Sequence, residues 1–299
     1  MPDRYASLLA CLPDRVRREL LAMAEGYADF WAHLFEIRLR ASHHAALTVN
    51  GRNLLLSTIL DHAELSTTFA KLCDNSVYAH AESLRQGYLT AYGCRVGVAG
   101  RAVREGGQVT AMADIRSLCI RIPHRVVGAG DVAARVFREM ECRRGILIYS
   151  PPGVGKTTLL RDLAYTLSCG ADARRVAVVD TRGELYGADA PAACQIDVLE
   201  GYPQGAGIEL ATRALSPQVI LCDEIGSEAD AAAILSVAGC GVPLIASAHG
   251  GSAEEVRARA PIRLLEGHGI FGAYIGIARG ETGYTYSITQ CRGDTVCYS

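Results

Sequence analysis

The chain has 299 residues and a formal net charge of −2, with 49% hydrophobic and 21% charged residues. This balance is typical of globular proteins and excludes a disordered chain, and the length suggests about two domains. The small net charge excludes a global positive field that would draw nucleic acid or anionic lipid. No apolar stretch approaches the ~18 residues that a membrane-spanning helix needs. Because the N-terminal Met1–Tyr5 segment is polar as well, we expect a soluble protein whose membrane contact is peripheral.

Eleven cysteines are scattered singly through the sequence, without a C-x-x-C pair or a Cys/His cluster at zinc spacing. Unpaired thiols are typical of a reducing compartment, and the spacing argues against a zinc site. The cysteines therefore indicate a cytoplasmic protein in which they serve as small core residues.

The first half of the chain mixes helical and strand patterns. Residues 1 to about 30 predict helix, with Pro13 and Asp14 at the start of one helix. Alternating residues over 35–40 predict a strand, and residues 46–56 predict a hairpin that turns at Asn50-Gly51. Further expected elements are a helical stretch around 66–87 and strands over 92–103, 109–113 and 118–122. These patterns predict a small α+β domain over residues 1–128, with the Gly-rich 126–130 segment as its linker.

Strand–helix alternation begins at Asp131 and predicts an α/β domain with a parallel sheet over residues 129–299. Buried strands are predicted over 146–149, 175–180, 217–224 and 242–249, and a closing hairpin over 273–278 and 284–289. Ligands of open α/β sheets bind at the carboxyl ends of the strands. The polar residues that end these runs are therefore expected to converge.

Residues 145–160 have the strand, turn and helix layout of a phosphate-binding loop. The candidate binding residues are Ser150, Pro151, Pro152, Gly153, Val154, Gly155, Lys156, Thr157 and Thr158. The glycines let backbone N–H groups converge on a phosphate at a helix N-terminus. Lys156 can reach the β- and γ-phosphates, and the Thr157 hydroxyl can ligate Mg²⁺. The usual pattern has Gly where this chain has Ser150, so an ordinary Gly-rich turn is the alternative to the predicted nucleotide site.

Two carboxylates, Asp223 and Glu224, end an apolar run and predict a Walker B strand. Asp223 would hold the Mg²⁺ hydration shell, and Glu224 would orient and polarise the attacking water. The alternative is that the pair caps the helix that follows. Ser247 and His249 end the next strand, where either could hydrogen-bond the γ-phosphate or the water. A strand-end His can also be an ordinary surface residue.

Several segments together resemble the stage III sporulation protein AA family. In the second half these are S-P-P-G-V-G-K-T-T-L-L-R-D (150–162), D-T-R-G-E (180–184), L-S-P-Q-V-I-L-C-D-E-I-G (215–226) and I-A-S-A-H-G (245–250). In the first half they are E-I-R-L-R (36–40), L-R-Q-G-Y (84–88), R-V-G-V-A-G-R (95–101) and C-I-R-I (119–122). The match runs in order over roughly residues 12–290, so it is more specific than a phosphate loop alone.

That family is similar to the type II and type IV secretion and pilus ATPases. The resemblance implies a RecA-like P-loop NTPase core after the smaller α+β domain, ATP and Mg²⁺ as cofactors, and a homo-oligomer in the form of a hexameric ring. It also implies a motor at the cytoplasmic face of a membrane, docked on channel proteins that join mother cell and forespore. His249 falls where the secretion ATPases carry their His box. Arg101 or Arg121 is the candidate for an N-domain arginine that reaches a neighbour's nucleotide.

The chain departs from the family at Thr181, where Glu is usual, and the D-T-R-G-E segment (180–184) is either an acidic adjunct to the site or a turn with an Asp cap. No His follows His268, so the Arg-x-x-x-His nucleic-acid module of related plastid proteins is not expected.

The leading hypothesis is an ATP-hydrolysing, secretion-type motor of a sporulation channel. One alternative is a nucleotide-gated scaffold with negligible turnover. The other is a nucleic-acid motor, which the net charge and the lack of an aromatic–basic stacking platform disfavour.

Overall fold

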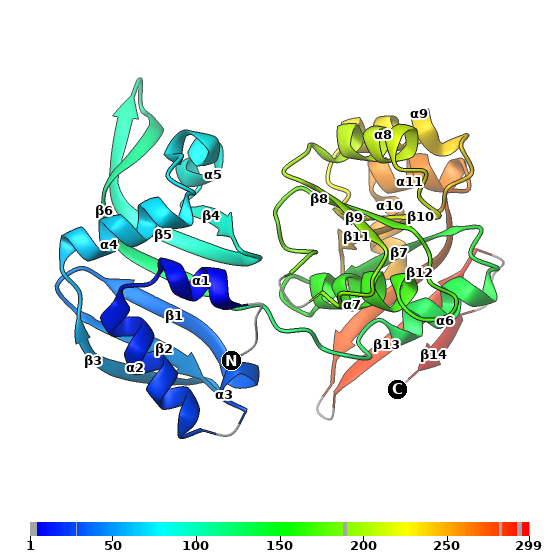
Figure 1. The fold of residues 1–299 in the computed structure, drawn as a ribbon. Helices are drawn as coiled ribbons and strands as arrows, with labels where there is room; N and C mark the ends of the chain where they lie inside the picture. The colour runs from blue at the N-terminus through cyan, green and yellow to red at the C-terminus, as the bar shows by residue number, and fades with distance from the viewer. Residues whose placement is uncertain (1–4, 28, 188–189, 281–282, 292–294, 299) are drawn as a thin grey trace. The chain divides into compact units, whose positions relative to one another are not determined.

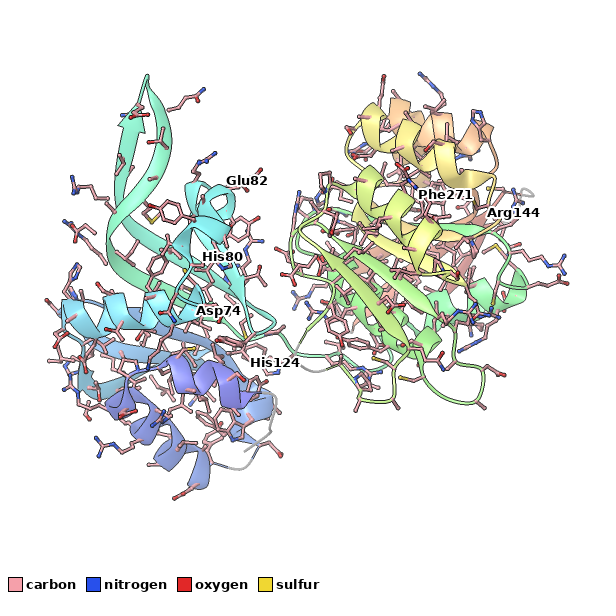
Figure 2. The ribbon with its side chains drawn as sticks, turned by 45° about the horizontal axis from the view of Figure 1, so that its top comes forward. Asp74, His80, Glu82, His124, Arg144 and Phe271 are labelled. Carbon is pink, nitrogen blue, oxygen red and sulfur yellow. The ribbon has the colours of Figure 1, made fainter. Side chains whose placement is uncertain are left out.

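The computed structural model describes residues 5–27, 29–187, 190–280, 283–291 and 295–298. The chain forms two compact units, unit 1 with chiefly residues 1–124 and unit 2 with chiefly residues 125–299 (Figure 1). The boundary expected from the Gly-rich segment, between residues 128 and 129, thus lies inside unit 2. His124, labelled in Figure 2, is the last residue of the main segment of unit 1.

Unit 1 contains a six-stranded antiparallel sheet with the strand order β3-β2-β1-β6-β5-β4. The strands are β1 (Leu34–Arg40), β2 (His44–Val49), β3 (Arg52–Ile59), β4 (Tyr88–Ala91), β5 (Cys94–Glu105) and β6 (Gln108–Arg121). Asn50 and Gly51 have φ values of 50° and 72°, the left-handed region that a tight hairpin turn requires. The hairpin predicted at this pair is therefore confirmed.

The helices of unit 1 pack on the apolar side chains of its sheet, and Leu20, Ile37, Leu65 and Leu118 are fully buried between them. The helices are α1 (Ala6–Cys11), α2 (Asp14–Glu25), α3 (Phe30–His33), α4 (His62–Leu72) and α5 (Ala81–Arg85), with a 3₁₀ helix at Val77–His80. Pro13 precedes α2 as predicted, because proline lacks the N–H that a continuing helix would use.

The helical stretch expected over 66–87 is wrong as a single helix. Helix α4 starts earlier, at a capping box in which Asp61 and Glu64 accept each other's backbone N–H groups. It ends at Leu72, and the chain then leaves the helical region because Asp74 and Asn75 have φ values of 48° and 58°. Short polar side chains tolerate this left-handed conformation, and it breaks the stretch in two.

Strands β5 and β6 extend beyond the rest of unit 1 as a two-stranded ribbon (Figure 1). The register shifts between Ala99 and Arg101. A Cβ atom at Gly100 would lie 2.7 Å from the carbonyl oxygen of Ala113, so the bulge at this point requires glycine. Arg101 follows the bulge and is exposed on the ribbon.

Unit 2 contains an eight-stranded sheet with the order β14-β13-β12-β7-β11-β10-β8-β9. The strands are β7 (Gly145–Ser150), β8 (Val176–Asp180), β9 (Ile196–Glu200), β10 (Val219–Glu224), β11 (Leu244–His249), β12 (Phe271–Arg279), β13 (Tyr284–Gln290) and β14 (Thr295–Tyr298). The sheet is parallel from β12 to β9, as predicted. Strands β13 and β14 continue it in antiparallel fashion, which makes the sheet mixed and confirms the closing hairpin.

Helices cover both faces of this sheet (Figure 1). They are α6 (Asp131–Glu139), α7 (Lys156–Ser168), α8 (Gln204–Ala214), α9 (Glu228–Ala238), α10 (Ala253–Ala258) and α11 (Ala260–Gly267). One apolar cluster joins α6 and α7 to the sheet. The other joins α8, α9, α10 and α11 to the opposite face and includes Phe271, labelled in Figure 2. This double layer holds β7 and α7 rigidly at the centre of unit 2.

A buried carboxylate ties the first residues of unit 2 to α7. The side chain of Asp162 is 1% exposed, and it accepts hydrogen bonds from Arg125 Nε and from the backbone N–H of Gly130, both at 2.9 Å. The guanidinium of Arg125 also lies 5.1 Å from the ring centre of Tyr165. These contacts hold Arg125 and Gly130, at either end of the expected linker, against α7 of unit 2.

Among the described residues, no helix is long and apolar enough to cross a bilayer.

Candidate functional site

Residues from two parallel strands, from the loops after β7 and β8 and from the start of α7 line a cavity of about 320 Å³ at the carboxyl edge of the unit 2 sheet. The loop and α7 contribute Gly153, Gly155, Lys156, Thr157 and Thr158. The ends of β10 and β11 contribute Asp223, Glu224, Ser247 and His249, and the turn after β8 contributes Arg182 and Glu184. The structure thus brings five of the residues predicted on the loop together with those predicted on β10 and β11.

The loop between β7 and α7 has the backbone conformation expected at a phosphate-binding turn. Gly153 and Gly155 have φ values of 76° and 119°, which side chains other than glycine rarely adopt. No side chain caps the N-terminus of α7, so the positive end of its dipole faces the cavity. Pro151 and Pro152 are exposed and do not line the cavity, and Val154 packs against the apolar cluster below.

Lys156 is buried, and its ammonium group donates hydrogen bonds to acceptors of its own loop and to His249. Its Nζ donates to the carbonyl oxygens of Ser150 at 3.0 Å and Pro151 at 3.3 Å, and it lies 3.4 Å from the Ser150 hydroxyl. The Nζ also donates to Nδ1 of His249 at 2.8 Å. Ser150, the residue that departs from the usual Gly, therefore holds the lysine through both its carbonyl and its hydroxyl.

His249 connects Lys156 to Glu224. Its Nε2 lies 3.1 Å from Glu224 Oε2, while its Nδ1 accepts from Lys156. This arrangement requires the proton on Nε2, which donates to the carboxylate. Arg182 lies at 4.0 Å from the same carboxylate oxygen. A cation, an imidazole and a carboxylate thus form a continuous chain across the cavity.

Burial raises the pKa of Asp223 to about 6. The side chains of Glu184, Asp180 and Glu224 add to this effect by repulsion, while Arg182 opposes it. Burial also lowers the pKa of Lys156, against the attraction of Glu224 and Asp223. A cation beside Asp223 would relieve the cost of burying its charge, which is the electrostatic setting of a metal ligand.

Asp223→Asn is expected to raise the free energy of unfolding of the protein without bound ligand by up to about 3 kcal/mol above pH 7. This gain is the free-energy equivalent of the rise in the pKa of Asp223 from 3.8 to about 6. Because the pKa of the folded state is the higher one, the stability linked to this carboxyl is complete below about pH 4 and is lost as the pH rises through about 6. The gain of the variant should therefore shrink between pH 7.5 and pH 5. Urea unfolding with a chelator at both pH values tests this.

The exposed Asp172→Asn is the matched control for Asp223→Asn, and it should change the free energy of unfolding by less than about 0.5 kcal/mol. If the Asp223→Asn protein is no more stable than wild type above pH 7, the conclusion that Asp223 is a buried and ionised carboxylate is wrong.

Ser247 is completely buried at the end of β11, opposite Glu224 of β10 in the sheet register. Its hydroxyl lines the cavity and has no hydrogen-bond partner among the described residues. An unsatisfied buried hydroxyl costs about 1–3 kcal/mol unless water or a ligand completes it. The hydroxyl is therefore placed to bond a molecule in the cavity.

Asp180 is a structural cap. Its two carboxylate oxygens accept the backbone N–H groups of Glu184, Leu185 and Tyr186 at 2.8–3.1 Å. Of the two roles predicted for residues 180–184, the turn capped by Asp180 agrees with these bonds, and Glu184 of the same segment also lines the cavity. Thr181 is exposed and donates its hydroxyl to the carbonyl of Tyr202.

Sequence reasoning left open whether residues 180–184 belong to the site, and it did not single out Arg182 and Glu184 as lining residues. The Asp180 carboxylate accepts the backbone N–H of Glu184, and Arg182 and Glu184 line the cavity beside Asp223 of β10. Sequence reasoning also missed an aromatic–basic pair in unit 1, where the guanidinium of Arg95 lies 4.0 Å from the ring centre of Tyr88. Facing strands bring these two residues together, and their separation along the chain hides the pair.

The two N-domain arginines proposed from the resemblance lie in different places of unit 1. Arg101 is on the exposed ribbon, paired in register with Ala113. Arg121 ends β6 on the sheet itself, between Glu36 of β1 and Arg95 of β5, and it is also exposed.

The fold and the loop after β7 define a P-loop ATPase fold. The ATPase DotB of Legionella pneumophila shares it with a TM-score of 0.65 and 16% identity, covering 93% of this chain and 82% of that one. The pilus retraction motor PilT, solved with bound ADP, gives a TM-score of 0.61 and 14% identity, covering 91% and 82%. The predicted core fold is therefore confirmed.

The sequence then identifies the family. The profile described as sporulation stage III, protein AA matches residues 3–296. Stage III sporulation protein AA of Bacillus subtilis is 31% identical over 279 residues, which is 90% of each chain. The chain belongs to the stage III sporulation protein AA family, as its motifs predicted.

Proposed function

We propose that the chain is a Mg²⁺-dependent ATPase whose phosphate loop is the Ser150–Thr158 segment. The observation that carries the proposal is the chain of contacts from Lys156 through His249 to Glu224, which joins a phosphate-binding lysine to a carboxylate that can act on water. A site that binds nucleotide without hydrolysing it does not require a carboxylate near the γ-phosphate, nor an imidazole that holds this carboxylate in place.

Each residue of the cavity has a defined part in the proposal. The loop N–H groups and Lys156 bind the β- and γ-phosphates, since both face the same cavity. Glu224 orients the attacking water and accepts its proton, because it is the carboxylate nearest the imidazole of His249. Ser247 and His249 contact the γ-phosphate or the water, and the unsatisfied Ser247 hydroxyl supports this part.

Mg²⁺ fits the oxygen groups of the cavity. The Thr157 hydroxyl and the Asp223 carboxylate line it together, and hydroxyl and carboxylate oxygens are the ligands that Mg²⁺ prefers. The raised pKa of Asp223 supports the fit, because a bound cation would compensate its buried charge. Bound there, the ion would neutralise charge on the phosphates.

At the larger scale we propose a homo-oligomeric ring, six-membered by analogy, at the cytoplasmic face of a membrane. It would power a secretion-type channel between mother cell and forespore, with channel proteins as docking partners. Membership of a sporulation family and the fold shared with a pilus retraction motor support this assignment. Arg101 and Arg121 are the candidates for contacts to a neighbouring subunit's nucleotide, since both are exposed.

Steady-state phosphate release with Mg·ATP across a range of protein concentrations tests the proposal. Specific activity should rise with concentration as the ring assembles, and it should vanish in Lys156→Ala, which loses the phosphate contact. Glu228→Gln on the exposed start of α9 is the matched control for a charge change and should retain full activity. Wild-type protein that fails to bind ATP at all would overturn the proposal.

A nucleotide-gated scaffold is the second candidate function. The observation that favours it is the phosphate loop with Lys156, which suffices to bind a nucleotide whether or not Glu224 acts on water. Glu224→Gln separates the two functions, because a scaffold would keep partner recruitment and its biological role without the carboxylate.

A nucleic-acid motor is the third candidate. The sequence disfavours it because it shows no aromatic–basic stacking platform, whereas the contact of Arg95 with Tyr88 in the structure is such a pair and favours it. Salt-dependent binding of single strands at micromolar protein, lost in Tyr88→Ala, would support it. Binding that is absent at low salt would eliminate it.

A further inference from the structure

The cavity described above offers contacts for a chain of phosphates but none for the nucleoside of a nucleotide. Its volume of about 320 Å³ is at the lower end of the range for small-molecule pockets. All the described residues that line it are glycine, polar or charged. A nucleobase binds through apolar and aromatic surface, so its contacts must lie beside this cavity and not within it.

The order of the strands fixes the direction in which the nucleoside leaves the loop. Glu224 and Ser247 lie on β10 and β11, on one side of β7, and they mark the γ-phosphate end. Strands β12 and β13 lie on the other side of β7. A triphosphate whose γ end faces β11 and β10 therefore directs its α-phosphate and its nucleoside toward β12 and β13.

Tyr284 is the aromatic residue at that position. It is the first residue of β13, opposite Arg279, and the register places it on the sheet face of Ile277 and Tyr286, which is the face covered by α7. A Cβ atom at Gly155 would lie 3.8 Å from the ring and hydroxyl of Tyr284, so the ring lies against the phosphate loop. Yet 47% of Tyr284 is exposed, which leaves ring surface open to a ligand.

We propose that the ring of Tyr284 is the stacking platform for the nucleobase of the bound nucleotide. This inference rests on the proposed ATP binding and adds the group that recognises the nucleoside. A flat aromatic ring stacks on any base, because every base has a π face. Tyr284 thus separates nucleotides from inorganic phosphates and does not by itself separate adenine from guanine.

Binding of Mg·ATP and of Mg·tripolyphosphate, measured by calorimetry, tests the role of Tyr284. Tyr284→Ala should weaken ATP binding about ten-fold, a loss within the range of base–aromatic stacking. Tripolyphosphate binding should be unchanged, because the phosphate contacts remain. Tyr284→Phe should bind ATP like wild type, since it keeps the ring. Tyr202→Ala, at a 42% exposed tyrosine after the edge strand β9, is the matched control and should bind both ligands normally.

A spectroscopic readout distinguishes stacking from a structural role of Tyr284. The native tryptophan, Trp31, lies in unit 1. Tyr284→Trp adds a second tryptophan, in unit 2. The fluorescence of this second tryptophan should be quenched by ATP and by GTP, and tripolyphosphate should leave it unchanged.

The outcomes for the two proposals are separable. If wild type and Lys156→Ala bind neither ligand, the ATPase proposal itself fails. If wild type binds ATP through Lys156 and Tyr284→Ala binds ATP equally well, only the stacking platform is overturned. Equal losses of ATP and tripolyphosphate binding in Tyr284→Ala would also overturn it, since they would show that the ring merely supports the loop.

Discussion

Replacing Glu224 with Gln is expected to reduce ATP turnover by about 10²–10⁴-fold, the usual contribution of a positioned general base. Gln keeps the size and hydrogen-bonding capacity of the side chain but cannot accept the proton of the attacking water. Binding of Mg·ATP should be retained, because the loop, Lys156 and Asp223 are unchanged. Single-turnover phosphate release at saturating protein isolates the chemical step from assembly and product release.

The contact of Glu224 with His249 makes the experiment sharper. His249→Ala removes the imidazole that lies 3.1 Å from the carboxylate, so it should reduce turnover less than Glu224→Gln does if the histidine only positions Glu224. The combined variant should then be no slower than Glu224→Gln alone. Turnover of Glu224→Gln within three-fold of wild type would remove Glu224 from the mechanism.

Replacing Asp162 with Ala is expected to lower the free energy of unfolding of unit 2 by about 3 kcal/mol, at the lower end of the cost of breaking a buried ion pair. The lower end applies because the Arg125 side chain is 25% exposed, although Asp162 is 1% exposed. The change also removes the acceptor of the Gly130 N–H. Asp172→Ala, at an exposed position of the same unit, should cost less than about 0.5 kcal/mol.

The two units should be followed separately in this measurement. Tryptophan fluorescence reports unit 1 alone, because the chain has a single tryptophan, Trp31. Hydrogen exchange of the α7 amides reports unit 2. The expected result is faster exchange in α7 with an unchanged urea midpoint for Trp31. Exchange in α7 that does not change would show that the pair of Asp162 and Arg125 contributes nothing to unit 2.

The core of unit 2 could be predicted because its strands carry strong and local signals. Apolar runs such as 219–222 are buried on both faces, and parallel strands present their carboxyl ends at one edge. That rule alone brings Asp223, Ser247 and the loop glycines together. The hairpin at Asn50-Gly51 was equally predictable, since the turn depends on two adjacent residues.

Other features depend on contacts that the sequence order does not reveal. Strand β9 was missed because its five residues include two carboxylates, and only its pairing with β8 makes it a strand. The contact of Lys156 with His249 joins residues that are far apart in the chain. The ring of Tyr284 reaches Gly155 only because β12 places β13 near β7. Such pairings follow from strand order, which local patterns do not encode.

The engagement of Lys156 by His249 has a consequence for the nucleotide cycle. The ammonium group of Lys156 has three N–H donors, and two carbonyl oxygens and Nδ1 of His249 already accept from them, so a phosphate that binds the lysine as proposed must displace at least one of these acceptors, which lowers its apparent affinity. In the proposed reaction, the same acceptors compete with ADP for the ammonium group. The proposed ATPase is therefore expected to release ADP quickly, because the acceptors of Lys156 take the place of the product's phosphates.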